Sequence, residues 1–259
     1  GVAQNSVANG KILQNTPFEN LYIPSAGHDA GISMGAAQYF YFNNLQNQRV
    51  EPLYNANLGI SFTNIQIKQI LDKKQLKYSF KEDNELFTYV AKAITNSGVI
   101  GFFDGKAEFG PRALGSRSIL ADPRNEKAQQ LLNEKIKKRE SFRPFAPSIL
   151  EECGDKFFEN YQFTPFMERV LPIKKDKQKL IPAVTHVDGS GRLQSVSKTL
   201  RPRYHQLILE FYKLTKIPIL INTSFNENEP VVNKPQEAID CYLRTDMDML
   251  VLGNYILEK

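Results

Sequence analysis

The chain has 259 residues, of which 41% are hydrophobic and 24% charged, a composition typical of a globular protein with a buried core. Its 2 cysteines are too few for a disulfide framework or a thiolate metal cage, so we expect a reducing, cytoplasmic environment. No stretch approaches the roughly 18 apolar residues of a membrane-spanning helix, so no membrane partner is expected.

The positive charge is concentrated in one part of the chain. The formal net charge is +5, and residues 106–143 alone contain 10 Lys and Arg against 5 Asp and Glu. The local excess equals that of the whole chain. A concentration of this kind indicates an anionic ligand.

The first elements are short. Residues 21–23 read as a strand, and the chain then passes through Gly27, Gly31 and Gly35 into an apolar stretch of small residues that predicts a helix. Residues 46–60 are polar and aperiodic, which makes them the best candidate for a domain boundary.

Stronger periodic signals follow and predict a mixed α/β fold. A helical stripe ends at Gly98 before a strand at 99–103, and Asp122-Pro123 has the form of a helix start. A helix around 207–211 and strands at 217–221 and 249–252 complete the pattern; Pro218 indicates that the first of these strands begins late or lies at an edge. The expected buried helix positions are Leu86, Tyr89, Val90, Ala93 and Ile94, then Ala128, Leu131, Leu132 and Ile136, then Leu207, Ile208 and Phe211.

The densest chemical signal is the segment 108–118. Gly110, Pro111 and Gly115 allow tight turns, while Arg112 and Arg117 supply forked cationic donors. Such a loop suits phosphate or carboxylate.

A second basic segment, 135–147, begins at the end of an expected helix and continues into a stretch stiffened by two prolines. Lys137, Arg139 and Arg143 could converge there on one anion. A solvated helix face is the simpler interpretation of a cationic run. We expect that simpler role for Lys127, Lys135 and Lys138.

Two polar turns are candidates of lower specificity. The short hydroxyl and amide side chains of 222–226, directly after a strand, could bind the phosphates or ribose of a nucleotide, although such residues are more often only a turn. The stretch 186–192 contains His186 and Arg192, which could supply a proton donor and a further anion clamp.

Together these segments resemble the O-carbamoyltransferase family of nodulation and antibiotic-tailoring enzymes. The matching stretches are EFGPRALGSRSILADPR at 108–124, RESFRPFAP at 139–147, HVDG at 186–189 and NTSFN at 222–226. Long ungapped matches are far more specific than a lone short motif.

The resemblance implies a C-terminal YrdC-like domain, a twisted sheet with flanking helices, at 56–259. It implies that 1–55 is the end of an actin-like transfer domain, so that the chain is the C-terminal part of a longer enzyme. The YrdC-like domain would make carbamoyl adenylate from carbamoyl phosphate and ATP with Mg²⁺. The actin-like domain would transfer the carbamoyl group to a hydroxyl of a small molecule.

The resemblance also distributes roles among residues. The pairs Lys137/Arg139 and Ser224/Asn226 match the nucleotide signatures of YrdC-like proteins. We assign Asn222 and Arg192 to nucleotide binding as well. The expected carbamoyl-phosphate and catalytic residues are Arg112, Arg117, Arg143 and His186.

Asp29, in the stretch 27–31, corresponds to the aspartate that joins two histidines in holding Fe²⁺ or another divalent metal in the actin-like domain. Those histidines come from a His-x-x-x-His pair. The 3 histidines of this chain offer no such spacing, so we expect an incomplete metal site.

Two alternatives remain open at this point. A tRNA-modification enzyme that forms threonylcarbamoyl adenylate would use the same kind of domain, and a YrdC-like RNA-binding module would use the basic segment 106–143. We do not expect a nucleic-acid partner, because the chain has no Trp and no interleaving of aromatic and basic residues.

Overall fold

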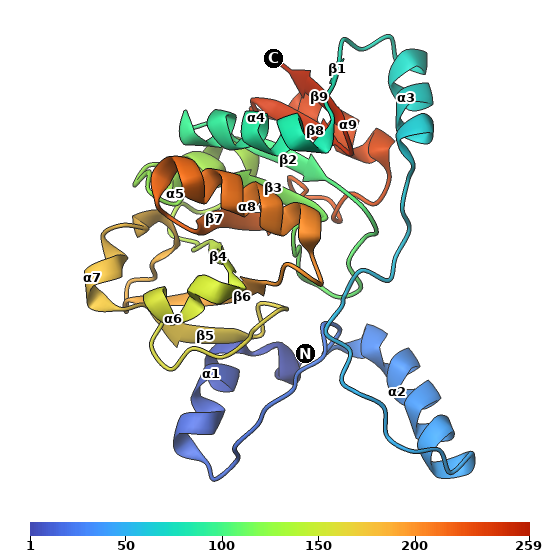
Figure 1. Cartoon of the computed structure of the whole chain (residues 1–259), viewed down its shortest axis with the longest axis vertical. Coiled ribbons are helices and arrows are strands. Elements are labelled where there is room, and N and C mark those ends of the chain that lie inside the picture. Colours follow the sequence, from blue (N-terminus) through green and yellow to red (C-terminus); the bar gives the residue numbers. More distant parts are fainter.

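The structure, a computed structural model, describes residues 1–259 except for the side chain of Lys135. The described residues contain one mixed sheet with the strand order β1-β9-β8-β2-β3-β7-β4-β6-β5 (Figure 1). β2 with β8 and β4 with β6 are parallel pairs, and the other neighbours are antiparallel. The strands are β1 Ser79–Phe80, β2 Ile100–Phe103, β3 Arg117–Ala121, β4 Ala146–Leu150, β5 Arg169–Pro172, β6 Ser190–Val196, β7 Ile219–Ser224, β8 Met249–Leu252 and β9 Tyr255–Glu258.

Helices cover the sheet and extend beyond it. α4 packs against α8, α8 contacts β4 and β7, and α9 contacts β2 and β8. None of the described helices is long and apolar enough to cross a membrane. The helices are α1 Ser6–Asn15, α2 Ile32–Tyr39, α3 Asn64–Lys73, α4 Asp83–Thr95, α5 Ala128–Leu131, α6 Gly154–Phe157, α7 Lys175–Gln178, α8 Pro202–Thr215 and α9 Pro235–Arg244. The predicted α/β class, a sheet with flanking helices, is confirmed.

The strongest periodic signal, residues 86–94, forms the interior of α4. Asp83 and Glu85 lie in its first turn, where carboxylates favour the positive end of the helix dipole. Its apolar stripe enters the main core, with Leu86, Val90 and Ile94 fully buried. Local periodicity was sufficient here because the stripe faces one continuous apolar layer.

The proline-containing segment at 217–221 becomes β7, which begins at Ile219, directly after Pro218. The late start is confirmed, but the edge position is wrong, since β7 lies between β3 and β4. Pro218 is tolerated because it stands before the strand and is not required to donate to the ladder. The polar residues 222–224 therefore lie at the carboxyl end of a central strand.

Two further predictions are corrected. Residues 21–23 form no strand; Leu21 is fixed instead through its carbonyl oxygen, which accepts a hydrogen bond from Arg169 Nη2. The helix expected from Asp122 begins only at α5, because the Asp122 carboxylate receives the backbone N–H and guanidinium of Arg124 in a local turn. α5 then continues as a π-helical turn over Leu132–Ile136. The prediction that Lys135 lies on a solvated helix face falls on a side chain outside the part of the chain that the structure describes.

The first residues form two separate helices. α1 packs against β5, the last strand of the sheet, whereas α2 projects away from the sheet (Figure 1). Asn9 joins α1 to the body, since its Nδ2 donates to the carbonyl oxygens of Glu168, at 3.0 Å, and Ala3, at 2.8 Å. Residues 56–60 run beside residues 107–109 and exchange backbone hydrogen bonds with them.

Candidate active site

A cavity of about 390 Å³ lies where β7 ends and where β3 and β4 begin. Four loops, the strands β4, β5, β6 and β7, and the start of α1 contribute to its wall. The lining residues are Ser6, Val7, Pro111, Arg112, Ala113, Arg139, Arg143, Pro144, Phe145, Ala146, Met167, Val170, His186, Arg192, Asn222, Thr223 and Ser224. The cavity thus brings together seven of the predicted site residues from four separate segments.

Four arginines line this cavity: Arg112, Arg139, Arg143 and Arg192. Among the lining residues that the structure describes, none is an Asp or Glu. The pKa of Arg192 is lowered to about 10, mainly by burial and in smaller part by the guanidinium groups of Arg112 and Arg139. Like charges held together in a partly buried space repel each other, so an anion in the cavity would relieve this repulsion.

The arginines differ in how they are held. Arg139 Nε donates to Asn133 Oδ1 at 2.7 Å, and its guanidinium lies 5.0 Å from the ring centroid of Phe145. Arg143 pairs with Glu140 at 2.8 Å, but both side chains are about half exposed. The buried Nε of Arg112 has no hydrogen-bond partner within the described residues. Arg112 therefore has a buried donor without a partner at the cavity wall.

His186 belongs to a short polar relay. Its Nδ1 lies 3.2 Å from Ser190 Oγ, which in turn donates to Asp188 Oδ1 at 2.6 Å. Because that hydroxyl proton is directed to a carboxylate, Ser190 Oγ accepts from Nδ1–H, and Nε2 retains its lone pair. Burial lowers the pKa of His186. The Asp188 carboxylate opposes this shift, and the Arg192 guanidinium adds to it. This geometry favours a neutral imidazole with a free Nε2, which suits accepting a proton more than donating one.

The predicted pairs Lys137/Arg139 and Ser224/Asn226 are neighbours in space. Lys137 Nζ donates to the backbone oxygen and Oγ of Ser224 and to the backbone oxygen and Oδ1 of Asn226. The pKa of Lys137 is lowered to about 7, mainly by burial and in smaller part by Arg139. Ser224 lines the cavity, but Lys137 and Asn226 do not. These two hold the turn that presents Ser224.

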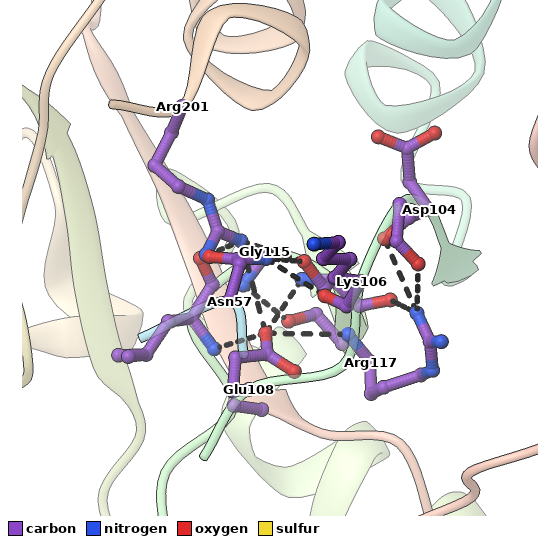
Figure 2. Close-up of polar contacts among 12 residues, drawn as sticks. Asn57, Asp104, Lys106, Glu108, Gly115, Arg117 and Arg201 are labelled. Carbon is purple, nitrogen blue, oxygen red and sulfur yellow. Dashed lines mark hydrogen bonds and ion pairs between the residues drawn. The ribbon is translucent and has the colours of Figure 1, made fainter. Parts of the chain in front are cut away.

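Arg117 lies outside the cavity, and its predicted role as part of the anion clamp is corrected. Its side chain is 1% exposed and its guanidinium stacks 3.6 Å from the ring centroid of Phe103. Nη1 donates to the carbonyl oxygens of Asp104, Gly105 and Ser116, and Nη2 to that of Ile60 (Figure 2). Arg117 therefore stabilises the loop between β2 and β3 on the side away from the cavity.

Glu108 and Arg201 also hold this loop in place, a role that no sequence pattern assigned to them. Glu108 Oε1 accepts from the backbone N–H groups of Leu114 and Ser116, at 2.8 and 2.6 Å (Figure 2). Arg201, directly before α8, donates to Leu114 O and Ser116 Oγ from the other side. The signal that could have revealed Glu108 is a lone carboxylate inside an otherwise basic, glycine-rich loop.

Asp29 is exposed at the start of a single helical turn, Asp29–Gly31. Among the described residues, no three His, Cys, Asp or Glu side chains gather closely enough to hold a metal ion. The residues present therefore do not fit the Fe²⁺ or other divalent metal that the resemblance implied.

Fold and cavity define an α/β protein with a cationic cavity at the carboxyl end of a central strand. The family model described as Carbamoyltransferase C-terminus matches residues 91–259, and the chain belongs to this family. The resemblance inferred from the four sequence stretches is thereby confirmed.

Curated relatives match over the whole chain. Nodulation protein NolNO of Sinorhizobium fredii and nodulation protein NolO of Bradyrhizobium diazoefficiens are both 41% identical to it. An uncharacterised protein of Synechocystis is 43% identical. The match covers 39%, 48% and 46% of these proteins, respectively, so the chain spans less than half of each.

Two solved structures are similar over part of the chain. HypF in a phosphate- and nucleotide-bound form has a TM-score of 0.47 at 19% identity, and covers 68% of this chain and 22% of its own. Sua5 of P. abyssi, complexed with L-threonine, has a TM-score of 0.47 at 14% identity, and covers 68% of this chain and 48% of its own.

Proposed function

We propose that this chain forms carbamoyl adenylate from carbamoyl phosphate and ATP, for transfer of the carbamoyl group to a hydroxyl of a small molecule. The observation that carries the proposal is the cavity with four arginines and no lining carboxylate. Two polyanionic substrates must approach each other in this reaction, and preorganised guanidinium groups offset their repulsion. Membership of the carbamoyltransferase family supports the choice of carbamoyl phosphate.

In this proposal the reaction has two steps. Water supplies an oxygen to carbamoyl phosphate, the bond between the carbamoyl group and phosphate is cleaved, and carbamate, phosphate and a proton result. His186 Nε2, which retains its lone pair, accepts the proton. A carbamate oxygen then attacks the α-phosphorus of ATP, and the bond to pyrophosphate breaks. Arg112, Arg139 and Arg192 bind the phosphoryl oxygens on which charge accumulates.

Other parts of the proposal depend on groups beyond this cavity. Mg²⁺ would accompany ATP and offset the charge of the leaving pyrophosphate. The proposed division assigns adenylate formation to 56–259 and the end of a transfer domain to 1–55. Ser6 and Val7 line the cavity, so the first segment also contributes to the wall of the proposed adenylate site. A metal at Asp29 would need ligands from outside the described residues.

The proposal is tested by exchange of radiolabelled pyrophosphate into ATP, with and without carbamoyl phosphate. We expect exchange that depends on carbamoyl phosphate, and its loss by roughly a hundredfold or more in Arg192→Ala, since one electrostatic donor contributes that much to related reactions. Lys127→Ala removes an equally charged but exposed side chain and should leave exchange unchanged. Equal exchange with and without carbamoyl phosphate would refute the proposal.

The same assay separates the alternatives. Exchange supported by threonine and bicarbonate, with carbamoyl phosphate inert, would indicate formation of threonylcarbamoyl adenylate. Tight binding of RNA that survives Arg112→Ala and Arg143→Ala would indicate a nucleic-acid-binding module, because the cavity would then play no part in it.

A further inference from the structure

Asn222 forms part of a buried polar network behind the cavity. It lies at the end of β7 and is 1% exposed, yet it also lines the cavity. Its Nδ2 donates to Gln194 Oε1 at 2.9 Å, to Ser148 Oγ at 3.1 Å and to the carbonyl oxygen of Ala113 at 3.2 Å. Its Oδ1 is buried and has no hydrogen-bond partner within the described part of the chain.

The orientation of this amide is fixed by its neighbours. Gln194 Nε2 donates to the carbonyl oxygen of Leu114 at 2.9 Å, so Gln194 Oε1 must face the other way. That oxygen already accepts from Ser148 Oγ at 2.6 Å. Turning Asn222 over would bring its Oδ1 against two acceptors, Gln194 Oε1 and the carbonyl oxygen of Ala113. The acceptor without a partner is therefore Asn222 Oδ1.

An acceptor without a partner is an unusual component of this cavity. Buried polar groups in native proteins are nearly always hydrogen-bonded. A buried acceptor without a partner beside a cavity is therefore a candidate for hydrogen bonding to a ligand. The four arginines suit anionic oxygens, which cannot donate to Asn222 Oδ1. Arg112 Nε is likewise unpartnered, but as a donor. A ligand that carries both anionic oxygens and an N–H group would satisfy both atoms at once.

We propose that Asn222 Oδ1 accepts a hydrogen bond from the amino group of the carbamoyl moiety and so selects carbamoyl phosphate over acyl phosphates that lack an N–H. This inference rests on the proposed function, since it assigns a specificity-determining residue to the same substrate. A site built to receive an N–H discriminates against an analogue without one, because the acceptor then stays unpaired.

Acetyl phosphate is the matched probe, since a methyl group replaces the amino group with little change of shape or charge. Calorimetry of the full chain with each ligand measures the preference. We expect carbamoyl phosphate to bind about tenfold more tightly, the difference that one hydrogen bond to a buried acceptor supplies. In Asn222→Leu the two dissociation constants should become equal within about twofold, since the acceptor is lost.

Two variants serve as controls. Ser148→Ala removes a neighbour of Asn222 but leaves Oδ1 in place, so the preference should persist. Asn222→Asp keeps an acceptor at the Oδ1 position, but its second oxygen then faces Gln194 Oε1 and the carbonyl oxygen of Ala113 and lowers stability. In the folded variant the charge weakens both ligands, and the preference should persist. Circular dichroism establishes that each variant is folded.

The outcomes are distinguishable. If neither ligand binds the wild type, the proposed function fails together with this inference. If both bind the wild type equally well, this inference is overturned while anion binding stands. If Asn222→Leu weakens both ligands to the same extent and keeps the preference, Asn222 has only a structural role. Should Asn222→Leu fail to fold, the wild-type preference and its retention in Asn222→Asp still decide the question.

Discussion

Arg112 and Arg117 belong to the same glycine-containing segment, five positions apart, but their side chains have opposite surroundings. Arg112 lines the cavity with an unused donor, whereas Arg117 is enclosed by backbone carbonyls and the ring of Phe103. The same residue type thus faces the cavity at one position and holds the loop at the other, and mutation should separate the two roles.

We expect Arg117→Ala to lower the free energy of unfolding by roughly 2–4 kcal/mol, because it leaves buried carbonyl oxygens without donors. Arg192→Ala should leave stability unchanged or slightly higher, since it removes a cation that its neighbours repel. Urea denaturation measures both free energies of unfolding. In calorimetry with pyrophosphate, Arg192→Ala should lose more affinity than Arg117→Ala. Equal stability losses in the two variants would contradict this assignment.

Lys137 gives a prediction about pH. Burial lowers its pKa from 10.5 to about 7. Between these values the unfolded chain binds a proton that the folded protein has released, so the folded state gains stability as the pH rises through this window. The stability of the wild type relative to Lys137→Met should increase by about 2 kcal/mol from pH 7 to about 9.

Urea denaturation at these pH values measures the Lys137 effect. Lys127→Met, at an exposed position, provides the comparison and should show no such trend. A relative stability that falls with rising pH would contradict the lowered pKa.

At the scale of elements, the loop between β2 and β3 contains three glycines with positive φ, Gly105, Gly110 and Gly115, of which Gly115 and Gly105 form a matched pair. Gly115 has φ +96°, and an added Cβ would lie 2.2 Å from the Tyr204 ring. Gly105 has φ +58° with open space around it. We expect Gly115→Ala to cost about 2–3 kcal/mol and Gly105→Ala only about 1 kcal/mol, since both carry backbone strain but only the first adds overlap.

Thermal unfolding of the two glycine variants tests this difference. Because the Gly115 overlap also displaces the loop that presents Arg112, affinity for pyrophosphate should fall in Gly115→Ala and stay near the wild-type value in Gly105→Ala. If both variants lose the same stability and bind equally well, the packing of Tyr204 against Gly115 is not what fixes the loop.

Elements with a local signal could be predicted from the sequence, and elements without one could not. The helix at 86–94 was predicted because its apolar positions repeat with the helical period. β3 and β4 have every residue buried, so their sequences show no alternation of polar and apolar positions. The strand predicted at 21–23 failed because a short apolar run does not identify its own pairing partner.

At the scale of the whole molecule, α1 closes one side of the cavity. Gly10 lies against β5, and an added Cβ would be 2.0 Å from the carbonyl oxygen of Val170. We expect Gly10→Val to displace α1 and to weaken pyrophosphate binding by roughly fivefold to tenfold, because Ser6 and Val7 would leave the cavity wall. Calorimetry measures the affinity, and faster proteolysis within residues 1–20 reports the displacement.

A glycine on the other N-terminal helix provides the matched control for Gly10. Gly35 lies in α2, and an added Cβ there meets nothing within 4 Å. Gly35→Val should therefore leave both the affinity and the proteolysis pattern of residues 1–20 unchanged. Unaltered pyrophosphate affinity in Gly10→Val would show that α1 is not required for the site.

The sequence by itself determined the fold class, the family and the segments that supply the site, because these depend on residue types and spacings along the chain. Only the tertiary structure decided which cations face the cavity. Whether Arg112 or Arg117 faces the cavity depends on how β3 pairs with β2 and with β7, and β7 lies far from β3 in the chain. The unpaired oxygen of Asn222 likewise follows from contacts with Ser148 and Gln194, which no local pattern encodes.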